Sequence, residues 1–277
     1  MERKPDLGGA LEALRARAPL IHLITNFVTV NDCANIVLAA GAAPTMARHP
    51  EEVEEITASA QALVCNLGAV EHGESMRLAG RKASLLGRPV VLDPVAVGAS
   101  GVRRKLVARL LEEVEVAVIR GNASEIRALA LGVGAGSGVD AAPGDLVTER
   151  GLGRAAELAG GLARCTGAVV VLSGPLDVVT DGRRAFVGRN GCAEMARVTG
   201  SGCMLSALTG AFCGALPERR LEAALAAVTA LGVSGERADR HRCAGGTGNA
   251  TFRNDLIDGM ELLTPDILER EARYDAL

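Results

Sequence analysis

Aromatic side chains are scarce in this 277-residue chain, and it has no excess of basic residues. It has no Trp, one Tyr and four Phe, so stacking platforms for nucleobases are not expected and small aliphatic residues must fill the core. The formal net charge is −3, without the broad basic surface that a phosphate backbone requires. Nucleic acids are therefore excluded as expected partners, whereas a 48% apolar share is enough for a folded core.

Long hydrophobic runs and paired cysteines are also absent. No apolar run reaches the roughly 18 residues of a membrane-spanning helix, and Met1 to Ala10 lack the apolar centre of a signal peptide. The seven cysteines are an odd number and include no CxxC pair. They predict reduced thiols, mostly small buried hydrophobes, in a cytoplasmic protein that has no membrane partner.

Several common catalytic signatures do not occur. The chain has no GxxxxGK[ST] phosphate loop, and no GxGxxG follows the first expected strand. It also lacks HExxH, GxSxG and paired Cys/His metal spacings. His49, His72 and His241 are isolated and favour surface or capping roles, whereas His22 lies inside an expected strand close to Asn26.

Apolar runs alternate with segments of helical spacing as far as residue 172. The expected strands are Leu20–Thr25, Ala42–Ala47, Ala62–Asn66, Pro89–Leu92, Val116–Arg120 and Ala168–Leu172. The expected helices are Asn31–Ala40, Glu51–Ala60, Glu71–Leu86, Val102–Val114 and Asp145–Cys165. Continuous apolar strands are covered on both faces, so the pattern predicts an α/β fold with a mainly parallel sheet between helix layers.

The remaining segments depart from this alternation. Asp177–Thr180 and Arg184–Val187, joined by an Asp-Gly turn, predict an antiparallel hairpin. From Gly202 the chain is expected to be helical almost to its end. A stretch with glycine at every second position from Gly132 to Gly138 predicts a mobile connection. No linker or repeat divides the sequence, so residues 1–277 are expected to form a single domain.

Polar residues gather directly after the apolar strands. In a parallel sheet the carboxyl ends of the strands meet at one edge, where ligands bind. The residues at these ends are Thr25, Asn26, Met46, Asn66, Gly68, Asp93, Pro94, Arg120, Gly121, Asn122, Glu125, Ser173 and Gly174. Asn, Asp and Ser are also ordinary turn residues, but their recurrence at equivalent places favours a binding site.

The segment Thr199-Gly200-Ser201-Gly202-Cys203 precedes an apolar helix, Met204–Leu216. Its glycines let the backbone approach a ligand closely, and successive N–H groups at a helix N-terminus form an anion site. Such a loop suits a phosphoryl group in transfer, and the helix dipole there favours the thiolate form of Cys203. A tight turn with a buried cysteine accounts for the same residues equally well.

Together, several segments resemble the hydroxyethylthiazole kinases. They are PLIHLITNFVTVNDCANIVLAAGAAPTM (Pro19–Met46), LDPVAVGAS, RGNASE and TGSGCMLS, and the C-terminal GTGNATFRNDLID matches more loosely. The resemblance covers nearly the whole chain and points to a family of thiamine salvage within the ribokinase-like superfamily. It implies a three-layer α/β/α sandwich that phosphorylates the hydroxyl of 4-methyl-5-(2-hydroxyethyl)thiazole with ATP and Mg²⁺.

The resemblance also implies where this thiazole alcohol binds. By position, Met46 and the backbone of Gly200 would contact the thiazole. Asn26 and His22 would lie near the same pocket.

Four further residues take implied roles toward the nucleotide. Arg120 and Ser173 would contact ATP, although the family usually has Thr at the second position. Asp93 and Glu125 would organise Mg²⁺, directly or through water. Two carboxylates and retained waters suit the octahedral demand of this ion.

Cys203 occupies the position where most ribokinase-like enzymes have an Asp base, and hydroxyethylthiazole kinases commonly have Cys there. Gly200, Ser201 and Gly202 would form the anion hole beside it. A thiol with the ordinary pKa of about 8.5 is mostly protonated at neutral pH. Because phosphoryl transfer depends mainly on positioning and charge neutralisation, the hypothesis is that Cys203 accepts or orients the proton of the substrate hydroxyl.

The resemblance further implies a homotrimer with the thiazole pocket at a subunit interface, and the apolar helix Val30–Ala40 is compatible with this. Two other interpretations stay open. One is another ribokinase-like enzyme, such as a hydroxymethylpyrimidine kinase or a nicotinamide-hydrate dehydratase, although these typically differ at Cys203 and lack ITNFVTVND. The other is a catalytically silent ligand-binding relative, which the joint presence of Asp93, Arg120, Glu125 and residues 200–203 opposes.

Overall fold

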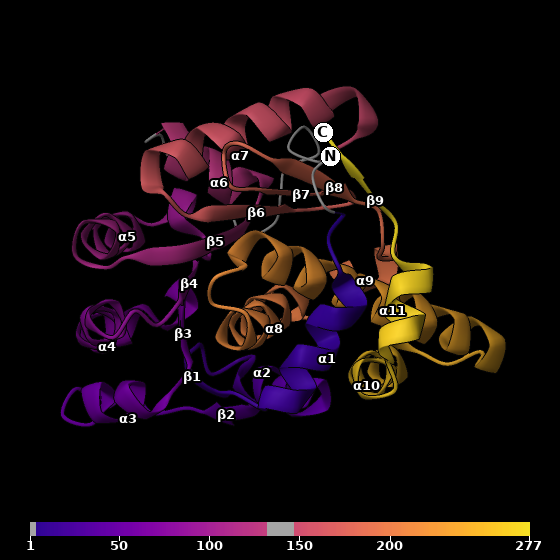
Figure 1. Cartoon of the computed structure of the whole chain (residues 1–277), viewed down its shortest axis with the longest axis horizontal. Helices are drawn as coiled ribbons and strands as arrows, with labels where there is room; N and C mark the ends of the chain where they lie inside the picture. The colour runs from indigo at the N-terminus through magenta and orange to yellow at the C-terminus, as the bar shows by residue number, and fades with distance from the viewer. Residues whose placement is uncertain (1–3, 132–146) are drawn as a thin grey trace.

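The computed structural model describes residues 4–131 and 147–277, whose strands form one nine-stranded sheet in the order β2-β1-β3-β4-β5-β6-β7-β8-β9 (Figure 1). The parallel strands are β1 (Leu20–Ile24), β2 (Ala43–Thr45), β3 (Ala62–Asn66), β4 (Val90–Asp93), β5 (Val116–Asn122) and β6 (Val169–Ser173). The antiparallel strands are β7 (Asp177–Thr180), β8 (Ala185–Gly188) and β9 (Tyr274–Ala276). The mainly parallel sheet and the hairpin are confirmed.

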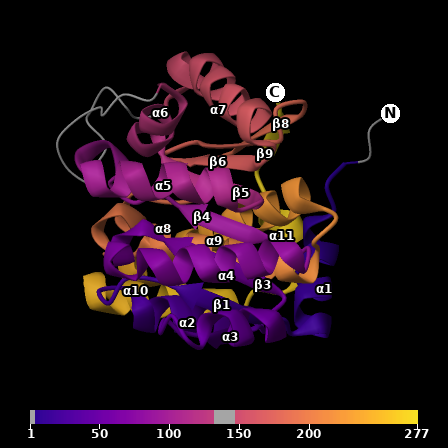
Figure 2. The same ribbon diagram turned by 90° about the vertical axis from the view of Figure 1, so that its left-hand side faces the viewer.

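Helices cover both faces of the sheet, and this confirms the three-layer α/β/α sandwich (Figures 1 and 2). One face carries α3 (Val53–Ser59), α4 (Gly73–Leu85), α5 (Gly101–Glu113), α6 (Ala123–Leu131) and α7 (Leu152–Thr166). The other carries α1 (Leu7–Arg17), α2 (Val30–Ala40), α8 (Ser201–Ala215), α9 (Arg220–Gly245), α10 (Asn249–Glu261) and α11 (Pro265–Glu271). Among the helices of the described residues, none has the length and apolar character needed to cross a membrane.

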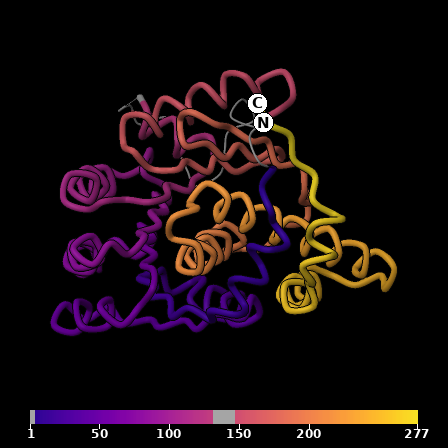
Figure 3. The backbone as a smooth tube through the Cα atoms, viewed as in Figure 1, coloured from indigo at the N-terminus to yellow at the C-terminus, as the bar shows by residue number. Residues whose placement is uncertain are grey.

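Successive residues of the central strands point to opposite helix layers. On β3, Val64 packs with the side chains of α8, whereas Leu63 and Cys65 pack with those of α4. Strands buried on both faces must be apolar throughout, which is why they are continuous hydrophobic runs in the sequence. The tube view shows α8 enclosed between the sheet and the outer helices (Figure 3), and Phe212 of α8 is fully buried.

Local signals account for several helix ends. α2 ends at Gly41, whose φ of +95° is the left-handed conformation that favours glycine. α5 begins after Ser100, whose hydroxyl accepts a hydrogen bond from the Arg103 amide. Both ends are set by residues within a few positions, so they were readable from the sequence.

Three elements were not predicted: α1, α6 and β9. α6 follows β5 without a loop, so Asn122 to Glu125 were interpreted as strand-end polar residues alone. β9 exists only because it pairs with β8, a contact between distant parts of the chain. The helix expected over Asp145–Cys165 begins at Leu152, after a 3-10 turn, and its residues 145 and 146 lie outside the described ranges. The glycine stretch Gly132–Gly138 lies outside them as well.

All seven cysteines are free thiols, as predicted, but they are not mostly buried. Cys33, Cys65 and Cys213 are buried in the core. The prediction of burial is wrong for Cys165 and Cys243, which are exposed on helix surfaces because the outward faces of α7 and α9 do not contact the sheet. Cys192 and Cys203 are half-buried.

Candidate active site

The carboxyl ends of four neighbouring strands bring together side chains that are far apart in the sequence. Asn66 ends β3 and Asp93 ends β4, and the two are register partners. Arg120 lies on β5, and Ser173 ends β6 opposite Asn122. These strand ends meet the N-terminus of α8, so the polar residues that the sequence placed after strands do converge on one edge of the sheet.

Asp93 is the buried acidic centre of this edge. Its side chain is fully buried, and Oδ2 accepts hydrogen bonds from Asn66 Nδ2 at 2.7 Å and from Ser206 Oγ at 2.8 Å. The other oxygen, Oδ1, has no hydrogen-bond partner within the described residues. Burial raises the pKa of Asp93, against the opposing effect of Arg120. An unpaired buried carboxylate oxygen is costly, so it marks a position where a positive ligand would be stabilised.

Arg120 links the strand ends to α8. Its guanidinium donates to Ser173 Oγ at 2.6 Å and lies 3.8 Å from Asp93 Oδ2. The same group packs against Gly202, where a Cβ would come within 2.6 Å of Arg120 Nη1. Glycine at this position therefore lets the guanidinium lie directly over the first turn of α8.

The first turn of α8 has the geometry of an anion site. Its N-cap is Gly200, with φ +88°, and it supplies no side chain to cap the helix. A Cβ on Gly200 would lie 2.5 Å from Thr29 Cγ2. Glycine is therefore required here for two reasons: the positive φ angle, and the lack of space for a side chain. The N–H groups of this turn point to where an external acceptor would bind, beside the Arg120 charge.

Cys203 lies in this first turn and accepts hydrogen bonds from two amides. Asn66 Nδ2 is 3.3 Å from the sulfur and Asn26 Nδ2 is 3.5 Å from it. Burial raises the pKa of the Cys203 thiol, and the neighbouring Asp93 carboxyl raises it further. The expectation of a favoured thiolate is therefore wrong: desolvation and a like charge outweigh the favourable effects of Thr29, Arg120 and Asn26.

Glu125 is held by a reciprocal helix cap at the start of α6. Its Oε2 accepts from the Asn122 amide while Asn122 Oδ1 accepts from the Glu125 amide, both at 2.9 Å. Its Oε1 accepts from the Ala96 amide at 2.9 Å. Burial, followed by the charge of Asp93, raises the pKa of Glu125 to about 7. The effect of Asp93 shows that the two carboxyls are close enough to interact electrostatically.

His22 and Met46 lie on the β1–β2 side of the edge. His22 is fully buried on β1, with Nδ1 2.8 Å from Thr57 Oγ1 and Nε2 2.7 Å from the carbonyl oxygen of Ala47. Both ring nitrogens are thus engaged, and burial lowers the pKa of the imidazole. Met46 follows β2 and is partly buried against the hydrophobic core. His22 therefore holds the segment that carries Met46.

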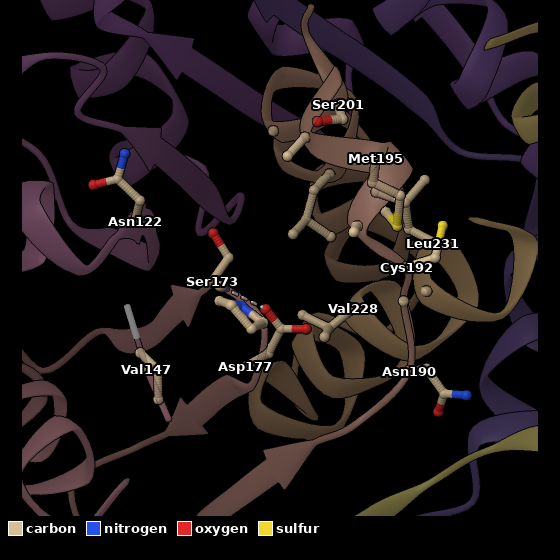
Figure 4. Close-up of a pocket in the computed structure, with 18 of the residues that line it drawn as sticks. Asn122, Val147, Ser173, Asp177, Asn190, Cys192, Met195, Ser201, Val228 and Leu231 are labelled. Carbon is tan, nitrogen blue, oxygen red and sulfur yellow. Dashed lines mark hydrogen bonds between the residues drawn. The ribbon is translucent and has the colours of Figure 1, made fainter. Parts of the chain in front are cut away.

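A cavity of about 520 Å³ opens beside this cluster. Of the predicted site residues, it is lined by Arg120, Ser173, Ser201 and Gly202. Figure 4 shows Ser173 and Asp177 on the strand side, Val228 of α9 next to Asp177, and Leu231 of the same helix farther from it. The other residues with predicted roles lie outside its lining, whereas Asn122 and Gly174, named only as strand-end residues, line it. The residues with predicted roles therefore mark one part of the cavity and the cluster next to it.

Sequence reasoning missed roles for Asn66, Ser206 and Asp177. Asn66 was one of the strand-end residues but received no role. Ser206 follows Cys203 by three positions on α8, and residues at that spacing share a helix face, so this signal was available. Asp177 was interpreted only as the start of a hairpin strand, because its burial depends on α9 packing across the sheet edge.

The chain matches the model of the hydroxyethylthiazole kinase family over residues 11–266. It is 48% identical over 268 residues to a hydroxyethylthiazole kinase of Clostridium acetobutylicum, a match that covers 96% of this chain and 98% of that protein. A hydroxyethylthiazole kinase of Desulfovibrio desulfuricans is 49% identical over 262 residues, covering 91% and 92% of the two chains.

Solved structures agree with this relationship. The structure of a hydroxyethylthiazole kinase protein from Pyrococcus horikoshii superposes with a TM-score of 0.86 and 36% identity, covering 98% of each chain. A ribokinase-like superfamily protein from Enterococcus faecalis, 13% identical with 95% of each chain covered, has a TM-score of 0.59 and shows the shared fold alone. The chain belongs to the hydroxyethylthiazole kinase family.

Proposed function

We propose that this protein transfers the γ-phosphoryl group of ATP to the hydroxyl of 4-methyl-5-(2-hydroxyethyl)thiazole, in thiamine salvage. Family membership supports the reaction class. The observation that carries the proposal is the convergence at α8: an uncapped helix N-terminus, the Arg120 guanidinium and the Cys203 sulfur lie side by side. A phosphoryl group bound by the first two would have an acceptor hydroxyl at the third.

The nucleotide would occupy the cavity. Arg120 and Ser173 line it next to Gly202, where phosphate oxygens would receive donors from a side chain and from the helix backbone. Charge developing on the transferred group would be stabilised by the amides of Gly200, Gly202 and Cys203, because the Ser201 amide already donates to the Val198 carbonyl at 3.4 Å. Preorganised donors cost little reorganisation during reaction, which is how such a loop accelerates transfer.

Cys203 would act by orientation. Because its pKa is raised, the sulfur carries a proton at neutral pH, and its role is to hold the substrate hydroxyl in line rather than to remove a proton fully beforehand. Two amides donating to the sulfur fix its position. A loose phosphoryl transfer needs little base strength, so this arrangement is sufficient.

Mg²⁺ fits the two carboxylates. The unpartnered Oδ1 of Asp93 is a direct ligand candidate, whereas both oxygens of Glu125 already accept backbone amides and would act through water. When bound, the ion would neutralise charge on the phosphates. Within the described residues, no group of three or more His, Cys, Asp and Glu side chains forms a metal site, in keeping with an ion held largely by waters and phosphates.

The thiazole would lie on the other side of Cys203. Asn26 and the backbone of Gly200 border this region, Met46 supplies an apolar contact, and His22 supports it through Ala47. Phe27 and Val28, directly after Asn26, are 77% and 56% exposed. Such exposed apolar groups beside a substrate region support a homotrimer in which a neighbouring subunit completes the pocket.

The whole chain is proposed to be one kinase domain, which the single continuous sheet supports, and a cytoplasmic location stays a prediction. The test is ATP consumption in a coupled ADP assay with and without the thiazole alcohol, using hydroxymethylpyrimidine as a parallel substrate. Thiazole-dependent ADP release is expected. ADP release with hydroxymethylpyrimidine but not with the thiazole alcohol would favour the alternative of a hydroxymethylpyrimidine kinase. Binding of the thiazole alcohol without ADP release would favour a catalytically silent ligand-binding protein.

A further inference from the structure

Asp177 is a buried acid whose carboxyl the mechanism above does not use. It begins β7, is only 8% exposed and lines the cavity (Figure 4). It pairs across the hairpin with Gly188, where a Cβ would lie 3.5 Å from both Asp177 Cβ and Val228 Cγ1. The Asp177 side chain therefore lies between the β7–β8 hairpin and the apolar side chains of α9.

Only one oxygen of the Asp177 carboxyl accepts a hydrogen bond from the described residues of the protein. Oδ1 accepts a hydrogen bond from the Gly174 amide at 3.0 Å. Oδ2 receives no hydrogen bond from any described residue of the chain. Burial raises the pKa of Asp177 to about 7, against the opposing effects of the Gly174 amide and Arg120. Burying a half-paired carboxyl is unfavourable, so a ligand donor at Oδ2 would offset part of that cost.

The chemistry of the cavity limits which part of a nucleotide can meet Asp177. Ionised phosphates carry no donors and would be repelled by a carboxylate, whereas the Arg120 guanidinium and the N-terminus of α8 offer them donors and positive charge. The donors of a nucleoside triphosphate are the ribose hydroxyls and the exocyclic amino group of the base. Asp177 lies beside the apolar Val228 of α9, and Leu231 of the same helix also lines the cavity (Figure 4); these apolar side chains suit the nucleoside rather than the phosphates.

We propose that Asp177 accepts, through Oδ2, a hydrogen bond from the nucleoside of ATP and thereby determines nucleotide specificity. The inference rests on the proposed placement of ATP in this cavity. A purely structural role, capping the turn after β6 through Gly174, is the competing explanation.

Asp177→Asn separates the two explanations. The Asn side-chain oxygen can still accept from Gly174, which preserves the turn, but its Nδ2 then places a donor where the nucleoside donor would bind. The matched control is Asp181→Asn, because Asp181 caps the next turn of the same hairpin through the Arg183 and Arg184 amides and does not line this cavity.

The experiment measures the affinities of wild type and both variants for ATP, 2′,3′-dideoxy-ATP and ITP by calorimetry, and KM for the thiazole alcohol by turnover. Wild type is expected to prefer ATP by about 10-fold or more over one analogue, the size of a hydrogen bond to a charged group. Weaker binding of the dideoxy analogue would identify a contact to the ribose. Weaker binding of ITP, which has an oxo group in place of the 6-amino group, would identify a contact to the base. Asp177→Asn should abolish that preference and leave KM for the thiazole unchanged.

Three results would overturn the inference: wild type that binds all three nucleotides equally, Asp177→Asn that keeps the wild-type preference, or Asp181→Asn that loses it. Because affinities are measured without turnover, the outcome is separable from the proposed function. Nucleotide binding with the predicted selectivity but no thiazole phosphorylation would refute the kinase activity alone. A wild type that binds none of the three would refute both.

Discussion

The side-chain nitrogen of Asn66 lies 3.3 Å from the sulfur of Cys203. The same nitrogen donates to Asp93 Oδ2 at 2.7 Å, and Asn66 Oδ1 accepts from the Gly68 amide at 2.9 Å. One amide thus connects the residue proposed to orient the acceptor hydroxyl with the carboxyl proposed to organise the metal. Since its oxygen is already fixed by Gly68, Asn66 can present its donors in one direction only.

Replacing Asn66 with Asp should therefore lower turnover by about tenfold or more, because both donors are lost and a second carboxyl is placed beside Asp93. Steady-state kinetics on ATP and the thiazole alcohol measures this, with Asn254→Asp on the exposed face of α10 as control. If the substitution changes only the KM for the thiazole and leaves kcat unaltered, the connecting role of Asn66 is contradicted.

Replacing Cys203 with Ala should reduce kcat by about 100-fold while the KM for the thiazole changes little, because positioning acts on the transition state. Cys203→Ser, which retains a hydrogen-bonding group, should recover part of the loss. Cys243→Ala, an exposed thiol on α9, provides the control. Unchanged kcat in the Ala variant would refute the role of Cys203.

Replacing Gly202 with Ala should raise the KM for ATP on the order of tenfold, because the added methyl would lie 2.6 Å from Arg120 Nη1 and displace the guanidinium from the phosphates. Gly153→Ala on α7 is the matched control, since a Cβ there has no neighbour within 4 Å. That control should leave kinetics unchanged. Equal effects of the two substitutions would argue against a steric cause at Arg120.

The raised pKa of Asp177 predicts a pH-dependent stability of the ligand-free protein. Between the unfolded value of about 3.9 and the folded value of about 7, the native state binds more protons than the unfolded state, so this residue lowers stability as pH rises through that window. The effect is at most about 4 kcal/mol, from about 1.4 kcal/mol per unit. Urea unfolding at pH 5 and pH 8 measures this for wild type and Asp177→Asn. From pH 5 to pH 8 the free energy of unfolding should fall less in the variant than in wild type. Equal falls in the two proteins would contradict the assignment to Asp177.

The proposed trimer predicts that a charge on the exposed part of α2 disrupts assembly. Leu38 is 55% exposed on that helix, and Leu38→Glu should shift the mass measured by light scattering from trimer to monomer and reduce activity. Leu262→Glu is the control, because Leu262 is 67% exposed beyond the end of α10. A wild type that is already monomeric, or a Leu38→Glu variant that stays trimeric, would exclude this interface.

The sequence alone determined the architecture, because strands buried on both faces must be continuous apolar runs and glycines such as Gly41 and Gly200 mark backbone conformations that other residues rarely adopt. It also placed Asp93, Arg120 and Cys203 at strand and helix ends. Tertiary structure decided the rest, since their interactions join positions far apart in the chain. Burial reversed the electrostatic expectation for Cys203, and the packing of α9 enclosed Asp177. Desolvation depends on the surrounding side chains, which no local pattern specifies.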